Sequence, residues 1–165
     1  MGKRVDNLVI RLHKGDDKTL ETLRNLSGAQ WRMVLYEEPY PWTVRDMVAH
    51  LLSAEKGLRR IAKNVAAGGP GAPRGFDYNA HNAEEQVRLA DLSLKKLLTG
   101  LTDARQATID WVSELDEADL DRTGYHPALG EVTLEALINA FHGHQLMHLR
   151  DLKALLRSSL PDQAA

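Results

Sequence analysis

The segment Thr133–Ser158, TLEALINAFHGHQLMHLRDLKALLRS, carries apolar side chains at steps of three and four residues. This spacing follows one face of an α-helix, and Thr133 is a favoured N-cap residue at its start. His144 and His148 interrupt the apolar stripe, whose other members are Leu134, Leu137, Ile138, Phe141, Leu152, Leu155 and Leu156. The segment therefore predicts a long amphipathic helix with two histidines on its buried side.

Three other segments show the same helical periodicity. The first spans about residues 5–26, and Gly15-Asp16-Asp17 is expected to be its weak point, where it bends or breaks. The second begins with a capping box, in which Thr43 is the N-cap and Asp46 lies three residues later. The third begins at Ser93 and reaches about residue 115. Because no segment alternates with a period of two, we predict an all-α four-helix bundle.

The connection between the second and third long helices decides the topology. It contains the run AAGGPGAPRG at residues 66–75, which is expected to be flexible and structureless, and a short helix opened by a capping box of Asn82 and Glu85. About 16 residues of extended chain span roughly 50 Å, whereas a helix of about 22 residues is roughly 33 Å long. The connection is thus long enough to return along the bundle, which allows the second and third helices to run parallel without requiring it.

Length, composition and charge are those of an ordinary globular domain. At 165 residues, 43% hydrophobic and 27% charged, the chain is long enough to bury a core as a single domain, residues 1–165. A net charge of −2 argues against nucleic-acid binding, and no apolar run approaches the ~18 residues of a membrane span. We expect no signal peptide and predict a cytoplasmic protein. Because the chain has no cysteine, any thiol that it uses must come from outside.

The histidines suggest a metal site. His144 and His148 lie four residues apart, so on a helix their rings project from one face at the spacing that holds one metal ion. His50 falls on or beside the apolar stripe of the second helix. Two buried neutral rings need partners for four nitrogens and two protonated rings repel each other, and a metal ion removes both problems. The alternatives are a chance spacing and core histidines with one hydrogen bond each.

The surrounding residues limit the chemistry of such a site. The sequence between His144 and His148 lacks the glutamate of the His-Glu-x-x-His proteases, and the chain has no Glu-x-x-His pair of the ferritin-type di-iron bundles. Three imidazoles on one divalent ion leave coordination positions open, as in catalytic sites. A metal ion held in this way can lower the pKa of a bound water or thiol and hold it as the nucleophile.

Three other residues are candidates for supporting roles. Asp46 precedes His50 by four residues and Asp151 follows His148 by three, so both carboxylates are placed to orient the rings. Asp46 is equally well explained by the capping box alone. His81 is placed to approach the open side of the site in a substrate pocket, the alternative being a histidine on a loop surface. Of the remaining histidines, His142 is assigned to the boundary of the core and His13 to the surface. His126 is expected to fix its loop by a hydrogen bond.

Four motifs in this order resemble the DinB-like (YfiT-like) superfamily over about residues 5–157. They are Trp42-Thr-Val-Arg-Asp-Met-Val-Ala-His50-Leu51, then Phe76-Asp-Tyr-Asn-x-x-Asn82, then His126-Pro-x-x-Gly-x-Val-Thr-Leu134, and last His144-x-x-x-His148-Leu149. The resemblance implies an up-down-down-up bundle, often a homodimer, and a metal ion held by the residues that match the family's three histidines: His50, His144 and His148.

The same resemblance implies a chemistry. Metals associated with the superfamily include zinc, nickel and manganese, and its characterised members include bacillithiol S-transferases and mycothiol-dependent maleylpyruvate isomerases. In these enzymes a low-molecular-weight thiol is the cosubstrate, which fits a chain without cysteine. The chain departs from many relatives at Asp151, where they carry glutamine.

We therefore predict a metal-dependent enzyme, either a thiol S-transferase or a hydrolase, in which the ion activates a thiol or water toward a small electrophilic substrate. Its catalytic groups beyond the metal ligands are not predicted. One alternative is a bundle that binds a metal or small ligand, or dimerises in a stress response, without turnover. A second is a bundle whose histidines bind nothing. The substrate pocket is expected to take its shape from three loops, at residues 31–41, 68–82 and 116–132.

Overall fold

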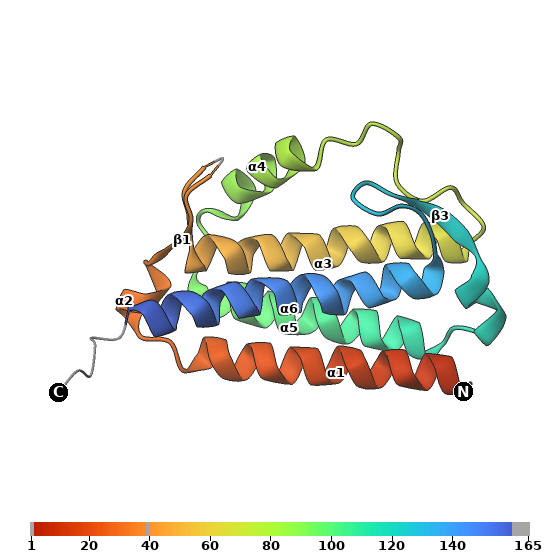
Figure 1. Ribbon diagram of the computed structural model, residues 1–165, viewed down its shortest axis with the longest axis horizontal. Helices are drawn as coiled ribbons and strands as arrows, with labels where there is room; N and C mark the ends of the chain where they lie inside the picture. Colours follow the sequence, from red (N-terminus) through yellow and green to blue (C-terminus); the bar gives the residue numbers. More distant parts are fainter. Residues whose placement is uncertain (1, 39, 160–165) are drawn as a thin grey trace.

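The computed structural model describes residues 2–38 and 40–159; the other residues of the predicted 1–165 domain lie outside the described part. Four long helices dominate it (Figure 1): α1 (Lys3–Arg24), α3 (Val44–Ala66), α5 (Leu94–Ser113) and α6 (Leu134–Ser158). The shorter elements are α2 (Gly28–Trp31), β1 (Val34–Tyr36), β2 (Trp42–Thr43), α4 (Tyr78–Leu89), the 3-10 helix η1 (Glu117–Asp121), β3 (Thr123–His126) and β4 (Gly130–Thr133). The predicted all-α four-helix bundle is confirmed.

The four long helices have the up-down-down-up order (Figure 1). After α3 the chain returns along the bundle through residues 67–93, which include α4, so that α3 and α5 run parallel. Helix α1 packs on α5 and α6, and α3 packs on the same two helices. Within the described residues, no helix combines the length and apolar character that a bilayer crossing requires.

Most of the predicted helix starts are confirmed by their caps. Thr43 Oγ1 accepts a hydrogen bond from the Asp46 backbone N–H at 3.3 Å, and the Asp46 carboxylate accepts one from the Thr43 N–H at 2.9 Å. Thr133 Oγ1 likewise accepts from the Ala136 N–H. These side chains bind N–H groups that the first helical turn leaves without a partner.

The predicted capping box of Asn82 and Glu85 is wrong. The N-cap of helix α4 lies five residues earlier, because the Asp77 side chain accepts hydrogen bonds from the backbone N–H groups of Asn79 and Ala80 at 3.0 Å. Aspartate is as good an N-cap residue as asparagine, so the earlier position is used. Asn82 consequently lies inside α4, where its side chain faces the bundle and not the helix end.

The expected break in α1 is also wrong, since the helix passes without interruption through Gly15-Asp16-Asp17. Gly15 is buried where α1 crosses α6, and a Cβ atom there would lie 2.6 Å from His142 Nδ1. The glycine therefore permits the close approach of two helices. The packing of these helices outweighs the cost of a glycine in a helix, which is about 1 kcal/mol relative to alanine.

The glycine-rich run at residues 66–75 is not structureless. Its backbone is bound to strand β3, with the Tyr125 N–H donating to Pro70 O and the Ala72 N–H donating to Tyr125 O, both at 2.8 Å. Gly71, at φ +90°, has no room for a Cβ atom, which would lie 2.5 Å from Tyr125 O. The chain that leaves α3 is thus fastened to the β3–β4 hairpin.

Two antiparallel hairpins, β1–β2 and β3–β4, were not predicted. Their strands are two to four residues long, which is too short to show a period of two in the sequence. Both hairpins lead directly into a long helix, β2 into α3 and β4 into α6. They place side chains beside the ends of the two helices that carry the predicted metal ligands.

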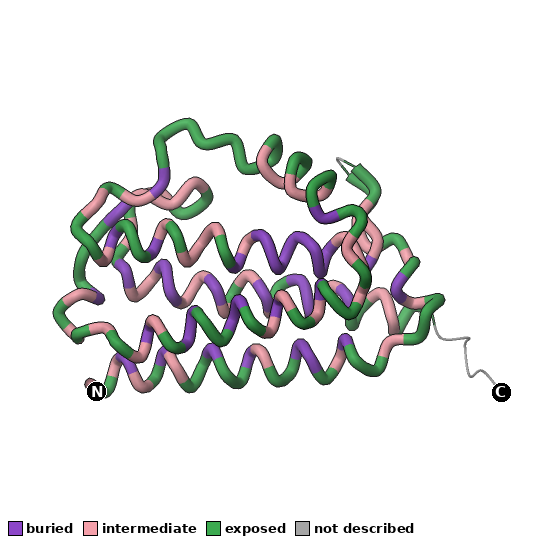
Figure 2. Tube along the Cα trace, turned by 180° about the vertical axis from the view of Figure 1, so that it is seen from behind, coloured by how far each residue is buried: buried purple, intermediate pink, exposed green. Residues whose placement is uncertain are grey.

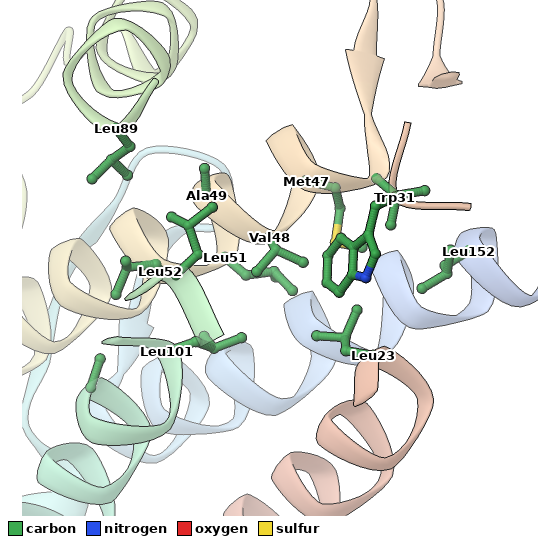
Figure 3. Close-up of a cluster of buried hydrophobic side chains, with 13 residues drawn as sticks. Leu23, Trp31, Met47, Val48, Ala49, Leu51, Leu52, Leu89, Leu101 and Leu152 are labelled. Carbon is green, nitrogen blue, oxygen red and sulfur yellow. The ribbon is translucent and has the colours of Figure 1, made fainter. Parts of the chain in front are cut away.

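Two apolar clusters fill the bundle, and buried residues follow the inner faces of the long helices (Figure 2). One cluster includes Leu23, Trp31, Met47 and Leu152, whose side chains meet where α1, α2, α3 and α6 come together (Figure 3). The other surrounds Phe141 near the opposite end of the bundle. Helix α4 is mostly exposed and lies outside this core (Figure 2).

A buried polar layer, with members from all four long helices, lies between the two apolar clusters: Thr19, Ser53, Glu55, Arg105, Thr108 and Gln145. At its centre Arg105 Nη2 donates to Glu55 Oε2 at 2.8 Å, and the two side chains are 1% and 4% exposed. Burial raises the pKa of Glu55, and the neighbouring Arg105 opposes that shift. The ion pair joins the parallel helices α3 and α5 in the middle of the bundle.

The Glu55–Arg105 pair provides a test of the packing. Replacing Arg105 with Met leaves the Glu55 carboxylate buried without its partner, so we expect the free energy of unfolding to fall by about 3–5 kcal/mol. The double variant Glu55→Leu/Arg105→Met removes both charges and is expected to recover most of that loss. Urea unfolding at pH 7 measures both values, and a double variant as unstable as Arg105→Met would contradict this view of the layer.

Candidate metal centre

The three predicted ligand residues come together where α3 packs on α6. His50 lies in the second turn of α3, and His144 and His148 lie one turn apart on α6. His144 Nε2 is 3.0 Å from His50 Nε2 and 3.1 Å from His148 Nε2. One ring nitrogen from each residue lies within 4.8 Å of the others, as the donor atoms of a single metal site do.

Hydrogen bonding between the rings does not satisfy this arrangement. Each imidazole nitrogen has one in-plane position, which holds either a hydrogen or a lone pair. His144 Nε2 therefore cannot make a well-aligned hydrogen bond to each of two atoms, yet it faces two other Nε2 atoms at hydrogen-bond distance. A cation that accepts a lone pair from each ring satisfies all three nitrogens, so this donor set fits a divalent metal ion.

The orientation of His148 is fixed by Tyr36 and Asp151. The Tyr36 hydroxyl donates to Asp151 Oδ2 at 2.9 Å and lies 2.7 Å from His148 Nδ1. Because the single hydroxyl hydrogen goes to the carboxylate, the hydroxyl oxygen accepts the hydrogen of Nδ1. This assignment leaves the lone pair of His148 on Nε2, directed at the centre of the group. Burial and the bond to Asp151 raise the pKa of Tyr36, which stays protonated.

Asp151 was expected to orient His148 directly. In the structure the Tyr36 hydroxyl lies between them and contacts both side chains. The sequence reasoning missed Tyr36. Tyr36 lies in the β1–β2 hairpin, which packs beside α6 and so brings the tyrosine next to His148. No motif in the sequence marks this contact. Tyr36 lies seven residues before the N-cap Thr43 and Tyr40 lies nearer to it, so no local signal distinguishes Tyr36 in the sequence.

The expectation that Asp46 orients His50 is corrected. Its carboxylate accepts hydrogen bonds from the Thr43 N–H and hydroxyl at 2.9 and 2.7 Å and lies 3.4 Å from Arg45. Within the described part of the chain no hydrogen bond joins Asp46 to His50. The capping box thus accounts for the position of the Asp46 carboxylate. His50 packs instead against Trp42, with ring centroids 5.0 Å apart.

Two cavities meet at His148. The larger, of about 690 Å³, lies along the groove between α3 and α6 and is covered by residues of α4 and of the β3–β4 hairpin. The smaller, of about 340 Å³, is formed by Tyr36, Glu38, Tyr40 and Trp42 with parts of α4 and α6. They share four lining residues: Trp42, Asn82, Met147 and His148. The three loops predicted to shape the pocket do contribute to these walls.

The other histidines lie where their interactions explain them. His81 lines the larger cavity, 5.3 Å from the Phe76 ring between centroids. His126 fixes its loop as predicted, since its Nδ1 accepts from the N–H groups of Ala128 and Leu129. His142 is half-buried against α1, and His13 is exposed.

The three clustered imidazoles are neutral at physiological pH. Burial lowers the pKa of His50 to about 3, and repulsion from the other two rings adds to the shift. Burial also lowers the pKa values of His144 and His148 to about 4. Neutral imidazole is the form that binds a metal ion, so no proton has to be displaced.

The comparisons with known proteins agree with this architecture. The model of the DinB superfamily matches residues 11–152. The chain belongs to the DinB superfamily. No curated protein matches it.

Several solved structures of DinB-type proteins share its fold. YfiT from Bacillus subtilis, described as a probable metal-dependent hydrolase with an unusual four-helix bundle topology, is 21% identical with a TM-score of 0.77, over 96% of this chain and 89% of that one. A mycothiol-dependent maleylpyruvate isomerase is 18% identical with a TM-score of 0.72, over 92% of this chain and 63% of that one. A DinB-like protein from Bacillus subtilis is 18% identical with a TM-score of 0.59, over 94% and 96%. At these identities the likeness concerns the fold.

The lowered pKa values predict a pH dependence for the metal-free protein. The unfolded chain binds a proton at each imidazole near pH 6.5, whereas the folded chain keeps these rings neutral down to about pH 3–4. The unfolded state therefore binds more protons as the pH falls. We expect the free energy of unfolding to drop between pH 7 and pH 5 by up to about 2 kcal/mol for each histidine.

Urea unfolding of the metal-free protein at pH 7, 6 and 5 measures this dependence. The variant His144→Gln is expected to lose less stability over the same interval, because one of the titrating groups is gone. A free energy of unfolding that is constant or rises toward pH 5 would show that the rings are not held neutral.

Proposed function

We propose that the protein is a metal-dependent enzyme in which His50, His144 and His148 hold one divalent ion beside a substrate cavity. The observation that carries the proposal is the group of three imidazoles, in which His144 Nε2 lies 3.0 Å from His50 Nε2 and 3.1 Å from His148 Nε2 and which hydrogen bonds between the rings do not satisfy. Zinc, nickel and manganese are the candidate metals. When bound, such an ion lowers the pKa of a coordinated thiol or water and so supplies the nucleophile for attack on a small electrophile.

The residues of the chain have distinct roles in this proposal. Tyr36 and Asp151 hold His148 in the tautomer whose Nε2 binds the ion. Trp42 packs on His50 and restricts its rotation. None of the three ligands carries a charge, so the ion keeps its full positive charge for polarising what it binds.

Two reactions fit this site, transfer of an external thiol to an electrophile and hydrolysis. YfiT is described as a probable metal-dependent hydrolase, and the isomerase of the same fold depends on mycothiol, a small thiol. A chain without cysteine supplies no thiol of its own, in keeping with a thiol cosubstrate. A homodimer in the cytoplasm remains our prediction for the native state.

Metal content is the first test. Protein purified without a histidine tag and incubated with zinc, nickel or manganese is expected to retain about one equivalent per chain after dialysis. His144→Ala and His148→Ala each remove one of three ligands and are expected to retain little metal by elemental analysis. His13→Ala, at an exposed position, is the matched control and should bind as the wild type does.

A graded effect is expected for Tyr36→Phe, which removes the hydroxyl that holds His148. The affinity for the metal should fall about 10–100-fold while all three ligands remain. Less than half an equivalent in the wild type, or equal occupancy in His148→Ala, would contradict the metal site itself.

Turnover separates an enzyme from a bundle that binds metal without catalysis. The metal-loaded wild type is expected to accelerate the loss of 1-chloro-2,4-dinitrobenzene or an epoxide in the presence of a small thiol, and His144→Ala is expected to abolish the acceleration. If only water is used, the product of epoxide opening is a diol. A rate equal to background with every thiol and metal would favour the non-catalytic binder.

A further inference from the structure

The larger cavity has no charged side chain of the acidic or strongly basic kind in its lining, since none of the described residues that line it is an Asp, Glu, Lys or Arg. Its floor between α3 and α6 consists of small residues, among them Ala54, Gly57, Ala140 and Gly143, and its walls carry Leu58, Ile61 and Phe76. The small residues along both helices open the space for a ligand, and the walls are apolar.

Charge therefore limits what this cavity can accept. Moving an ionised carboxylate from water into an apolar cavity without a partner costs several kcal/mol. The polar side chains that line it belong to Trp42, Ser53, Tyr78, Asn82 and five histidines, and none of them is a carboxylate, an ammonium or a guanidinium group. An apolar ring or chain, in contrast, gains the free energy of leaving water without any such cost.

The smaller cavity has the opposite character. It is lined by Tyr36, Tyr40 and Asn79 together with the carboxylates of Glu38 and Asp151. Asp151 is partly neutralised by Arg150 at 3.5 Å, whereas no ion pair to Glu38 exists among the described residues. His148 borders both cavities, so the candidate metal centre lies at their junction.

We propose that the larger cavity is the binding site of an uncharged, largely apolar electrophile, and that the polar nucleophile reaches the centre from the smaller cavity. This inference rests on the proposed function and names its substrate class. The two ligands then bind on opposite sides of His148 and do not compete. In the thiol reaction with a chloroarene, the sulfur lone pair forms the new bond to the aryl carbon, chloride leaves with the electrons of the broken bond, and the thiol proton passes to solvent.

The charge selection is tested by binding of an unreactive matched pair, 1,3-dinitrobenzene and 3,5-dinitrobenzoate. Isothermal titration calorimetry of the metal-free protein, in which no cation offers the carboxylate a partner, is expected to show that dinitrobenzene binds at least about tenfold more tightly. Leu129→Lys places an ammonium group at the mouth of the larger cavity, where Leu129 is 52% exposed, and is expected to reduce or reverse that preference. Leu129→Gln is the uncharged control and should keep it.

The arrangement of the two cavities is tested by competition. A cobalt-loaded sample titrated with thioglycerol reports thiolate ligation by its charge-transfer absorption, and saturating dinitrobenzene is expected to change the apparent Kd less than twofold. Glu38→Lys, in the smaller cavity, should alter the Kd of the thiol and leave that of dinitrobenzene unchanged.

The outcomes distinguish this inference from the proposed function. Equal or tighter binding of dinitrobenzoate, binding of neither compound, or simple competition between dinitrobenzene and the thiol would each overturn the inference, and none of them bears on the metal ligands. Selective binding of dinitrobenzene without turnover of any electrophile would instead support the assignment of the cavity and contradict the enzymatic function.

Discussion

The contact between α3 and α6 is the constraint on which the candidate site depends. It brings the imidazole of His50 to those of His144 and His148, which lie far from it in the sequence. His144 Nε2 is 3.0 Å from His50 Nε2 and 3.1 Å from His148 Nε2, in surroundings that keep the rings neutral. Burying them has a cost, because neutral rings with facing lone pairs lack partners that water would supply. A divalent cation turns that cost into a favourable interaction. The packing of two helices and the chemistry of the site are thus one feature of the molecule.

The rest of the chain holds this contact in place and gives it a substrate space. On the far side of the bundle, α1 and α5 pack against the same two helices, and the Glu55–Arg105 pair joins α3 to α5 in the polar layer. On the near side, α4 and the two hairpins cover the groove between α3 and α6. The Tyr36 hydroxyl extends the support of the site to a hairpin that packs on α6.

The features that could be predicted from the sequence are those that depend on residues close to one another in the chain. The caps at Thr43 and Thr133 and the three- and four-residue periodicity identify the long helices, because both depend on residues within a few positions. The spacing of two histidines on one helix is equally local. Tyr36 acts through a hairpin whose strands are too short to recognise, so its partnership with His148 is visible only in three dimensions. The burial of Arg105 was not predicted either, since a charged residue on a helix is ordinarily assigned to the surface.

The central claim is that three imidazoles bind one divalent ion, and X-ray absorption at the zinc edge of the zinc-loaded protein tests it most directly. We expect a first shell that contains three nitrogens at about 2.0–2.1 Å, with the outer-shell scattering of three imidazole rings and the remaining position taken by oxygen or an added thiol sulfur. In His50→Ala the imidazole count should fall to two. A shell of oxygens alone, or a spectrum that His50→Ala leaves unchanged, would contradict the account.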